Sequence, residues 1–367
     1  MNKTAAWPLA GIYAALIIYA SLYPFESWRS QGVDWTAFLW APWPRYWTSF
    51  DVLSNVLGYA PLGFVVALAL QRSAPQWPAV ILTVAMGSLL ALAMESLQLF
   101  LPARVPSNLD WCLNSLGTLM GAGAAWILER FGFLDRWSRF RANWFLPDAK
   151  GSLVLLALWP VALLFPAPVP MGLGQVLERA EEALAVWLQE TPWLDWLPVR
   201  EVELQPLLPF YEILCVSLGQ LLPCLLAFSL VRHGHQKVVS WFFLSGLGLL
   251  CTALSAALTY GPVHAWSWMS PQVQVALVMA AVAAWPLMWL KEKTLQVLAL
   301  VGLVLQLTLL NNASANAYFA LTLQNWEQGQ FIRFHGLIQW LGWLWPFVLL
   351  VYLMRRLSSA RHTKMSP

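Results

Sequence analysis

Long apolar segments separated by short polar ones run along nearly the whole chain. Each is about 18 to 25 residues long, enough to cross a hydrocarbon core of about 30 Å. Lipid offers the backbone no hydrogen-bond partners, so each segment is expected to be an α-helix. We predict an all-α, polytopic integral membrane helical bundle of about ten transmembrane helices, at residues 8–24, 52–71, 78–101, 109–129, 151–168, 207–231, 238–259, 271–290, 295–312 and 336–354.

The positions of Lys and Arg predict the orientation of this bundle, since positively charged loops stay in the cytoplasm. With the N-terminus inside, fifteen of the 21 basic residues fall on the cytoplasmic side. Those that fall outside are Arg29, Arg45, Arg104, Arg179, Arg200 and Arg333. We therefore predict an N-in, C-in protein, which agrees with an even number of spans.

Composition excludes several classes of protein. Hydrophobic residues make up 59% of the 367 positions and charged residues only 11%, against about 25% charged residues in a typical soluble domain. The net charge of +3 is explained by the cytoplasmic loops and gives no indication of nucleic-acid binding. All four cysteines lie in predicted spans, so we expect neither disulfides nor a metal cluster. No motif indicates a cofactor.

A basic, aromatic cytoplasmic linker at residues 131–150 divides the chain. A four-span unit, residues 1–130, precedes it, and a six-span region, residues 151–355, and a basic cytoplasmic tail, residues 356–367, follow it. The composition of the linker is typical of an amphipathic helix lying in the inner membrane surface. An ordinary positive-inside loop with an aromatic belt explains the same composition.

Polar residues recur one helical turn apart near the outer ends of the second, third and fourth predicted spans. This polar cluster consists of Asp51, Asn55, Glu95, Gln98, Arg104, Asp110 and Asn114. Charged and amide side chains are costly in a bilayer, so they usually face a bundle interior and have a function. We take these seven residues as ligand-binding candidates and assign no catalytic residue.

Small residues continue the polar faces toward the membrane interior. Gly117 and Gly121 lie seven and eleven positions after Asp110, on the same helix face, and Gly58 has the corresponding place in the second span. The four-residue spacing of the glycines in the fourth span lets another helix backbone approach closely. We expect this approach to hold the polar ends of neighbouring helices together.

The loop between the third and fourth spans carries the one arginine of the cluster. Two prolines stiffen this loop, and Ser107 or Asn108 is expected to cap the fourth helix. Arg104 is therefore tethered close to Glu95 and Asp110. Its guanidinium group can bind a protein carboxylate or an external carboxylate or phosphate.

The polar positions resemble the pattern of the VanZ-like family over roughly residues 10–130. The matching motifs are Asp51-x3-Asn55, Pro61-Leu62-Gly63-Phe64, Glu95-x2-Gln98-Leu99-Phe100-x3-Arg104 and Asp110-x3-Asn114-x2-Gly117. The family takes its name from a small membrane protein associated with resistance to the glycopeptide antibiotic teicoplanin. The resemblance implies a multi-pass protein of the bacterial inner (cytoplasmic) membrane with an envelope-related role. It carries over no proven catalytic residues.

Three functions fit the polar cluster. It can be a set of interhelical hydrogen bonds that stabilise the helix packing of a structural or assembly protein. It can bind a membrane lipid, a lipid-linked envelope precursor or an amphiphilic drug, because amides and acids suit sugar hydroxyls and the aromatic residues Tyr59, Phe100 and Trp111 suit sugar rings or lipid tails. It can be the centre of a membrane enzyme that acts on an envelope precursor, with Glu95 as general base. The sequence leaves these functions, transport and the oligomeric state open.

Polar residues of the six-span region give weaker signals. Glu212, one turn into the sixth span, is a secondary candidate: it is either an interfacial carboxylate, or it joins the polar cluster or lines a passage between the two halves of the chain. His233 and His235 could supply at most half of the ligands of a metal site. Their place in a positively charged cytoplasmic loop accounts for them without a metal. The acidic periplasmic loop, residues 169–205, contains a predicted surface helix at residues 174–189. The last outer loop has a second polar rim, expected at headgroup level, that consists of Asn311, Asn312, Asn316, Arg333 and His335.

Overall fold

The computed structural model describes residues 6–362 except residues 24, 26, 33, 35, 72–74, 103, 197–206 and 314–331. In this described part the chain forms thirteen α-helices and two short 3-10 helices, and its β-structure is one isolated bridge between Phe145 and Val231. The predicted all-helical fold is confirmed. The chain divides into two compact units, Met1–Phe140 and Arg141–Pro367, and each has its own apolar core.

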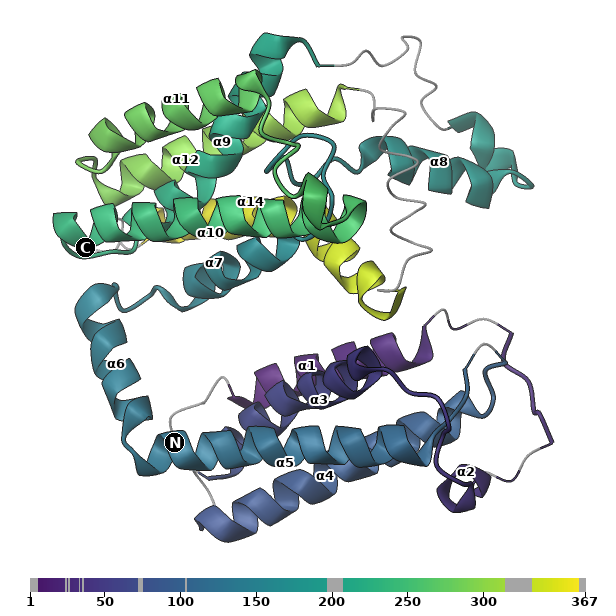
Figure 1. Cartoon of the computed structure of the whole chain (residues 1–367). Helices are drawn as coiled ribbons and strands as arrows, with labels where there is room; N and C mark the ends of the chain where they lie inside the picture. The colour runs from purple at the N-terminus through teal and green to yellow at the C-terminus, as the bar shows by residue number, and fades with distance from the viewer. Residues whose placement is uncertain are drawn as a thin grey trace. The chain divides into compact units, whose positions relative to one another are not determined.

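The first unit is a small bundle in which α5 packs most extensively against α3 (Figure 1). Its helices are α1 (Ala6–Leu22), α2 (Ala37–Trp40), α3 (Ser49–Leu70), α4 (Gln76–Gln98) and α5 (Asn108–Arg130). An apolar core between α1, α3 and α4 includes Ile17, Tyr59, Leu62 and Met94. Since Tyr59 belongs to this core, one polar group of the first unit is buried among apolar side chains.

Glycines allow α3 and α5 to pack in backbone contact. A β-carbon at Gly117 would collide with the carbonyl oxygen of Val56, and one at Gly121 with that of Ala60. The predicted close approach through these glycines is confirmed. Gly58 does not share it, because a β-carbon there would meet no atom within 4 Å. On α3 the residue that approaches α5 is Gly63.

The basic, aromatic linker contains a helix, α6 (Phe133–Trp144). Its aromatic residues at 133, 137, 140 and 144 recur at helical spacing and lie along one side. Phe133, Trp137 and Phe140 are exposed, and Trp137 stacks on Phe140 with 5.6 Å between the ring centroids. The guanidinium group of Arg136 lies over the ring of Phe133. The linker therefore contains a helix with an aromatic side, as the amphipathic-helix interpretation predicted.

The second unit is organised around one buried helix, α9, which packs against α11 and α12 and more lightly against α7 and α10. From Cys215 to Phe228 nearly every residue of α9 is buried. The helices of this unit are α7 (Lys150–Ala162), α8 (Leu177–Leu188), α9 (Pro209–Phe228), α10 (Gly234–Tyr260), α11 (Pro271–Leu287), α12 (Glu292–Asn311) and α14 (Ile332–His362). The predicted surface helix corresponds to α8, on which Leu184, Val186 and Trp187 are exposed.

Each of the ten predicted spans contains an α-helix, although the span predicted at residues 151–168 extends beyond the end of α7. Among the described residues, six helices are long and apolar enough to cross a membrane: α3, α4, α9, α10, α12 and α14. Three more apolar helices, α1, α7 and α11, have 17, 13 and 17 residues and are shorter than a full span. The chain is therefore an all-helical, multi-pass membrane protein, while ten crossings and the N-in orientation remain predictions.

Candidate functional site

The polar cluster lies at one end of the first unit, where α3 and α5 begin and α4 ends. α3 and α5 are joined by a direct bond: the amide Nδ2 of Asn55 donates a hydrogen bond of 2.8 Å to Oδ1 of Asp110. The predicted cap of α5 is Ser107, whose hydroxyl accepts hydrogen bonds from the backbone N–H groups of Leu109 and Asp110. These contacts fix the Asp110 carboxylate at the positive end of its own helix.

Glu95 is the deepest acid of the cluster. It lies on the last turns of α4, and its side chain is only 3% exposed. One carboxylate oxygen, Oε2, accepts a hydrogen bond of 2.9 Å from the backbone N–H of Ser107, the residue that caps α5. Glu95 therefore joins the end of α4 to the start of α5.

Asp51 serves the start of its own helix. Its carboxylate Oδ2 accepts hydrogen bonds from the backbone N–H and the hydroxyl of Thr48, at 3.0 and 2.8 Å. The Thr48 hydroxyl in turn accepts a bond from the backbone N–H of Asp51. This is a capping box, which the spacing of Thr48 and Asp51 in the sequence already indicates. The i,i+4 spacing of Asp51 and Asn55 does not predict this bond.

Gln98 and Arg104 bind the last turn of α1. Gln98 Nε2 donates a hydrogen bond of 3.0 Å to the carbonyl oxygen of Ser21, and Arg104 Nη2 donates one of 2.7 Å to that of Tyr23. Helix C-termini leave such carbonyl groups without intrahelical partners, and a cation there is favoured by the helix dipole. These two residues therefore attach the end of α1 to the end of α4 and to the loop that follows it.

Two polar atoms in the same region are buried with no hydrogen-bond partner among the residues that the structure describes. They are the Tyr59 hydroxyl on α3 and Oδ1 of Asn114 on α5. Each residue is only 5% exposed. Asn114 was a candidate from the start, whereas Tyr59 had been expected only to border the site. The arrangement offers hydrogen-bond donors and acceptors, and in the described residues no group of three or more His, Cys, Asp or Glu residues could hold a metal ion.

Comparison with known families identifies this part of the chain. A family model described as VanZ/LLP1 matches residues 7–129 of the 367-residue chain. This segment is VanZ-like. The VanZ-like segment, residues 7–129, contains nearly all of α1 and α5 and the helices between them, and it includes every residue of the polar cluster. No curated protein and no solved structure matches the chain.

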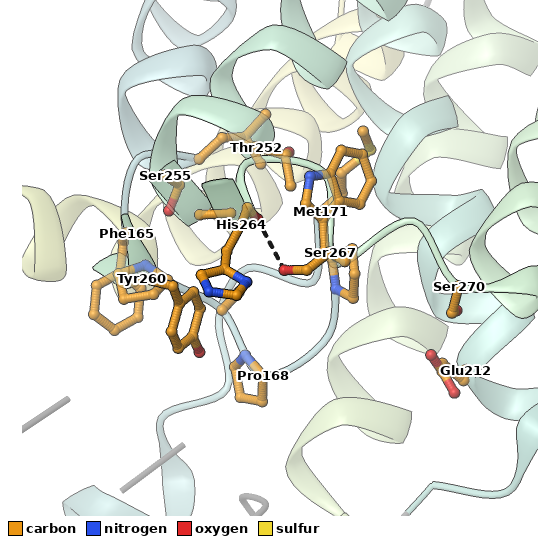
Figure 2. Close-up of a pocket in the computed structure, with 16 residues that line it drawn as sticks. Phe165, Pro168, Met171, Glu212, Thr252, Ser255, Tyr260, His264, Ser267 and Ser270 are labelled. Atoms are coloured by element: carbon orange, nitrogen blue, oxygen red, sulfur yellow. Dashed lines mark hydrogen bonds between the residues drawn. The ribbon is translucent and has the colours of Figure 1, made fainter. Parts of the chain in front are cut away.

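Glu212, the secondary candidate, lies outside the VanZ-like segment. It is in the first turn of α9 in the second unit, where it lines a pocket of about 700 Å³ (Figure 2). Other walls of the pocket come from residues 163–171, from the end of α10 and from residues 261–270. This pocket lies within the second unit, so the roles predicted for Glu212, an interfacial carboxylate or part of a passage between the two halves of the chain, stay predictions.

The other polar residues of the second unit have structural roles. Asn311 was expected in a loop at headgroup level, but this expectation is wrong: Asn311 is 7% exposed and ends α12. Its amide group donates to the carbonyl oxygens of Gly174 and Leu307 and accepts from the backbone N–H groups of Val176 and Leu177. Asn311 therefore anchors the start of α8.

The described residues include only part of the polar rim that was predicted in the last outer loop. They include both histidines, 233 and 235. Asn312 is exposed, Asn316 lies outside the described residues, and Arg333 and His335 are placed only as part of the helical backbone of α14. His233 caps α10, and its ring stacks on that of His235 with 5.8 Å between the centroids.

Proposed function

We propose that the VanZ-like segment binds an amphiphilic molecule of the cell envelope, such as a membrane lipid or a lipid-linked precursor, at its polar cluster. The observation that carries this proposal is a buried carboxylate accompanied by buried polar atoms with unused bonding capacity. Glu95 is 3% exposed, and the Tyr59 hydroxyl and Asn114 Oδ1 lack hydrogen-bond partners in the described part of the chain. Most buried polar groups in proteins are paired, so each of these atoms calls for an explanation.

The cost of leaving such atoms unpaired supports a ligand. A buried donor or acceptor without a partner costs about 1–3 kcal/mol. A bound group that donates to Asn114 Oδ1 and accepts from the Tyr59 hydroxyl would recover this energy, and a sugar hydroxyl or an amide does both. The carboxylates of Glu95 and Asp110 add further acceptors, so the site suits a headgroup that is rich in hydroxyl or N–H donors.

The surface at the same end of the unit suits an apolar tail. Phe100 and Val105, in the segment that joins α4 to α5, are 41% and 85% exposed. Exposed apolar side chains next to a polar cluster favour a ligand with both a polar head and a hydrocarbon part. With the predicted N-in orientation, the site would open on the outer face of a bacterial inner membrane. Binding of an envelope precursor there would give a physical basis for a contribution to glycopeptide-type antibiotic resistance.

A structural role is the second candidate. The bonds from Asn55 to Asp110 and from Arg104 to Tyr23 join α3 to α5 and attach α1 through the loop after α4. Interhelical hydrogen bonds in a bilayer contribute about 0.6–2 kcal/mol each, which is enough to explain them as stabilising contacts. A structural role accounts for the hydrogen bonds that Asn55, Gln98 and Arg104 form. It does not account for the buried, unpaired polar atoms of Tyr59 and Asn114.

The two accounts predict different results for Glu95→Gln. Glutamine keeps an oxygen that accepts the bond from Ser107 but removes the charge. In a strain that lacks the gene, wild type, Glu95→Gln and a control, Asp34→Asn, are compared for abundance in the membrane and for sensitivity to envelope-targeting antibiotics. Asp34 is an exposed acid of the same unit outside the cluster.

Ligand binding predicts normal abundance of Glu95→Gln with loss of complementation, and full activity of Asp34→Asn. Loss of abundance and complementation together would support the structural account. Full complementation by Glu95→Gln would contradict the binding site.

A further inference from the structure

The second unit contains a preformed pocket that is independent of the VanZ-like segment. Its volume of about 700 Å³ lies in the usual range of small-ligand sites, about 300–1,000 Å³. The predicted span at residues 151–168 is too long, because α7 ends at Ala162 and the following residues form one wall of this pocket. Figure 2 shows His264 and Tyr260 on one side of the pocket and Glu212 and Ser270 on the other.

Hydrogen bonds hold the walls in place. The hydroxyl of Ser255 on α10 donates to the carbonyl oxygen of Leu164 at 2.9 Å, which joins α10 to the segment after α7. The hydroxyl of Ser267 donates to the carbonyl oxygen of His264 at 2.8 Å, as the dashed line in Figure 2 shows. A site whose walls are already ordered loses less conformational entropy when a ligand binds.

The charge of the lining selects for a cation. Glu212 is its carboxylate, and none of the described residues that line the pocket is Lys or Arg. In the described part of the chain, no side chain forms a hydrogen bond or ion pair with this carboxylate. A negative ligand would meet an unbalanced carboxylate here, whereas a positive group would balance it.

The remaining lining residues favour an organic cation with an apolar part. Tyr260, Trp268 and Phe165 supply aromatic rings, and such rings attract ammonium groups through their electron-rich faces. Three prolines and Met171 supply apolar surface nearby. The Thr252 hydroxyl also lines the pocket, and it is buried with no hydrogen-bond partner among the described residues. It leaves one bonding position for a neutral polar atom of a ligand.

We propose that this pocket binds an amphiphilic organic ammonium ion. The ammonium group pairs with Glu212, and the apolar part lies against the aromatic rings and the proline-rich wall. Two sources carry this chemistry: the amine headgroup of a lipid and a soluble amine. The proposal does not rest on the function of the VanZ-like segment, since Glu212 and the pocket belong to the second unit.

Three probes that share a benzyl or phenyl group test the charge preference. Equilibrium dialysis of the full chain in dodecyl maltoside measures binding of benzyltrimethylammonium, benzyl alcohol and benzoate. We expect benzyltrimethylammonium to bind about tenfold more tightly than benzyl alcohol, and benzoate to bind most weakly. Equal affinity for the three probes, or tightest binding of benzoate, would overturn the proposal.

Variants assign the binding to the pocket. Glu212→Gln should weaken benzyltrimethylammonium binding about tenfold, and Glu190→Gln, an exposed acid after α8, should leave it unchanged. If Glu212→Gln lowers the thermal midpoint of the protein, Tyr260→Leu replaces it as the test, because Tyr260 is 49% exposed and its truncation leaves the core intact. Binding that is the same in wild type, Glu212→Gln and Tyr260→Leu would overturn the proposal.

A displacement experiment distinguishes a lipid headgroup from a soluble amine as the source of the ammonium group. Dihexanoyl phosphatidylethanolamine and dihexanoyl phosphatidylglycerol are added separately to the protein with bound benzyltrimethylammonium. Displacement by the first lipid alone supports a lipid headgroup as the ligand, and displacement by neither supports a soluble amine. Displacement by phosphatidylglycerol alone would contradict a cation site.

Discussion

Asn55 on α3 donates a hydrogen bond of 2.8 Å to Asp110 on α5, although 55 positions separate the two residues in the chain. The bond lies beside the glycine contacts through which the two helices touch, so polar and steric contacts fix one helix pair together. This pair carries Tyr59 and Asn114, whose hydroxyl and Oδ1 atoms are buried with no hydrogen-bond partner among the described residues.

The strength of this bond is measurable by a double-mutant cycle. Asn55→Ala and Asp110→Ala should each lower the free energy of unfolding in detergent, and the double variant should lose less than the sum of the two. We expect a coupling energy of about 0.6–2 kcal/mol, the range for interhelical hydrogen bonds in bilayers. Strictly additive losses would show that the pair contributes no bond of its own.

The glycine contacts between α3 and α5 make a steric prediction. A β-carbon at Gly121 would collide with the Ala60 carbonyl oxygen, so Gly121→Ala should force the helices apart and destabilise the protein by about 1–3 kcal/mol. Gly123 is the matched control on the same helix, because a β-carbon there would meet no atom within 4 Å. Gly123→Ala should leave thermal stability unchanged or raise it slightly. Equal effects of the two substitutions would contradict the packing.

Local spacing predicted this helix contact because residues four positions apart on a helix must share a face. The same rule failed for Gly58, since spacing does not say which of several faces meets the partner helix. For Asp51 the spacing offers two local patterns, the i,i+4 pair with Asn55 and the capping box with Thr48, and the structure shows the capping box. The capping box forms because the N–H groups at the start of α3 need acceptors.

Contacts between distant segments account for what the sequence could not predict. Asn311 binds backbone groups that lie more than 130 positions earlier, and no periodic pattern links it to them. The pocket of the second unit likewise combines Glu212 with residues from two other segments. Apolar residues 163–168 were assigned to a span because they are hydrophobic, but they line a wall of this pocket outside the helix.

Asn311 should be essential for the order of the segment before α8. Asn311→Ala leaves the backbone N–H groups of Val176 and Leu177 without their acceptor and so removes two bonds that join the start of α8 to the end of α12. Hydrogen–deuterium exchange at these two amides should therefore rise strongly. Asn312→Ala, at the exposed neighbouring position, should leave the exchange unchanged. Unchanged exchange in Asn311→Ala would contradict the anchoring role.

The predicted N-in orientation is tested by labelling from one side of the membrane. Val105, 85% exposed beside the polar cluster, should lie outside, and Lys293, exposed at the start of α12, should lie inside. In a Cys112→Ser background, which removes the exposed native thiol, a membrane-impermeant maleimide should label Val105→Cys in intact spheroplasts and Lys293→Cys only after permeabilisation. The reverse pattern would place the polar cluster on the cytoplasmic face.

Mass spectrometry of the lipids that co-purify with the full chain tests the central claim most directly, because it detects the ligand itself. Wild type and Asp34→Asn should retain the same envelope amphiphile, enriched over the bulk membrane lipids. Glu95→Gln should lose it while its thermal midpoint stays within the error of wild type, since the bond to Ser107 is kept. An identical lipid profile in all three proteins would contradict a binding site at the polar cluster and leave it as a structural contact between helices.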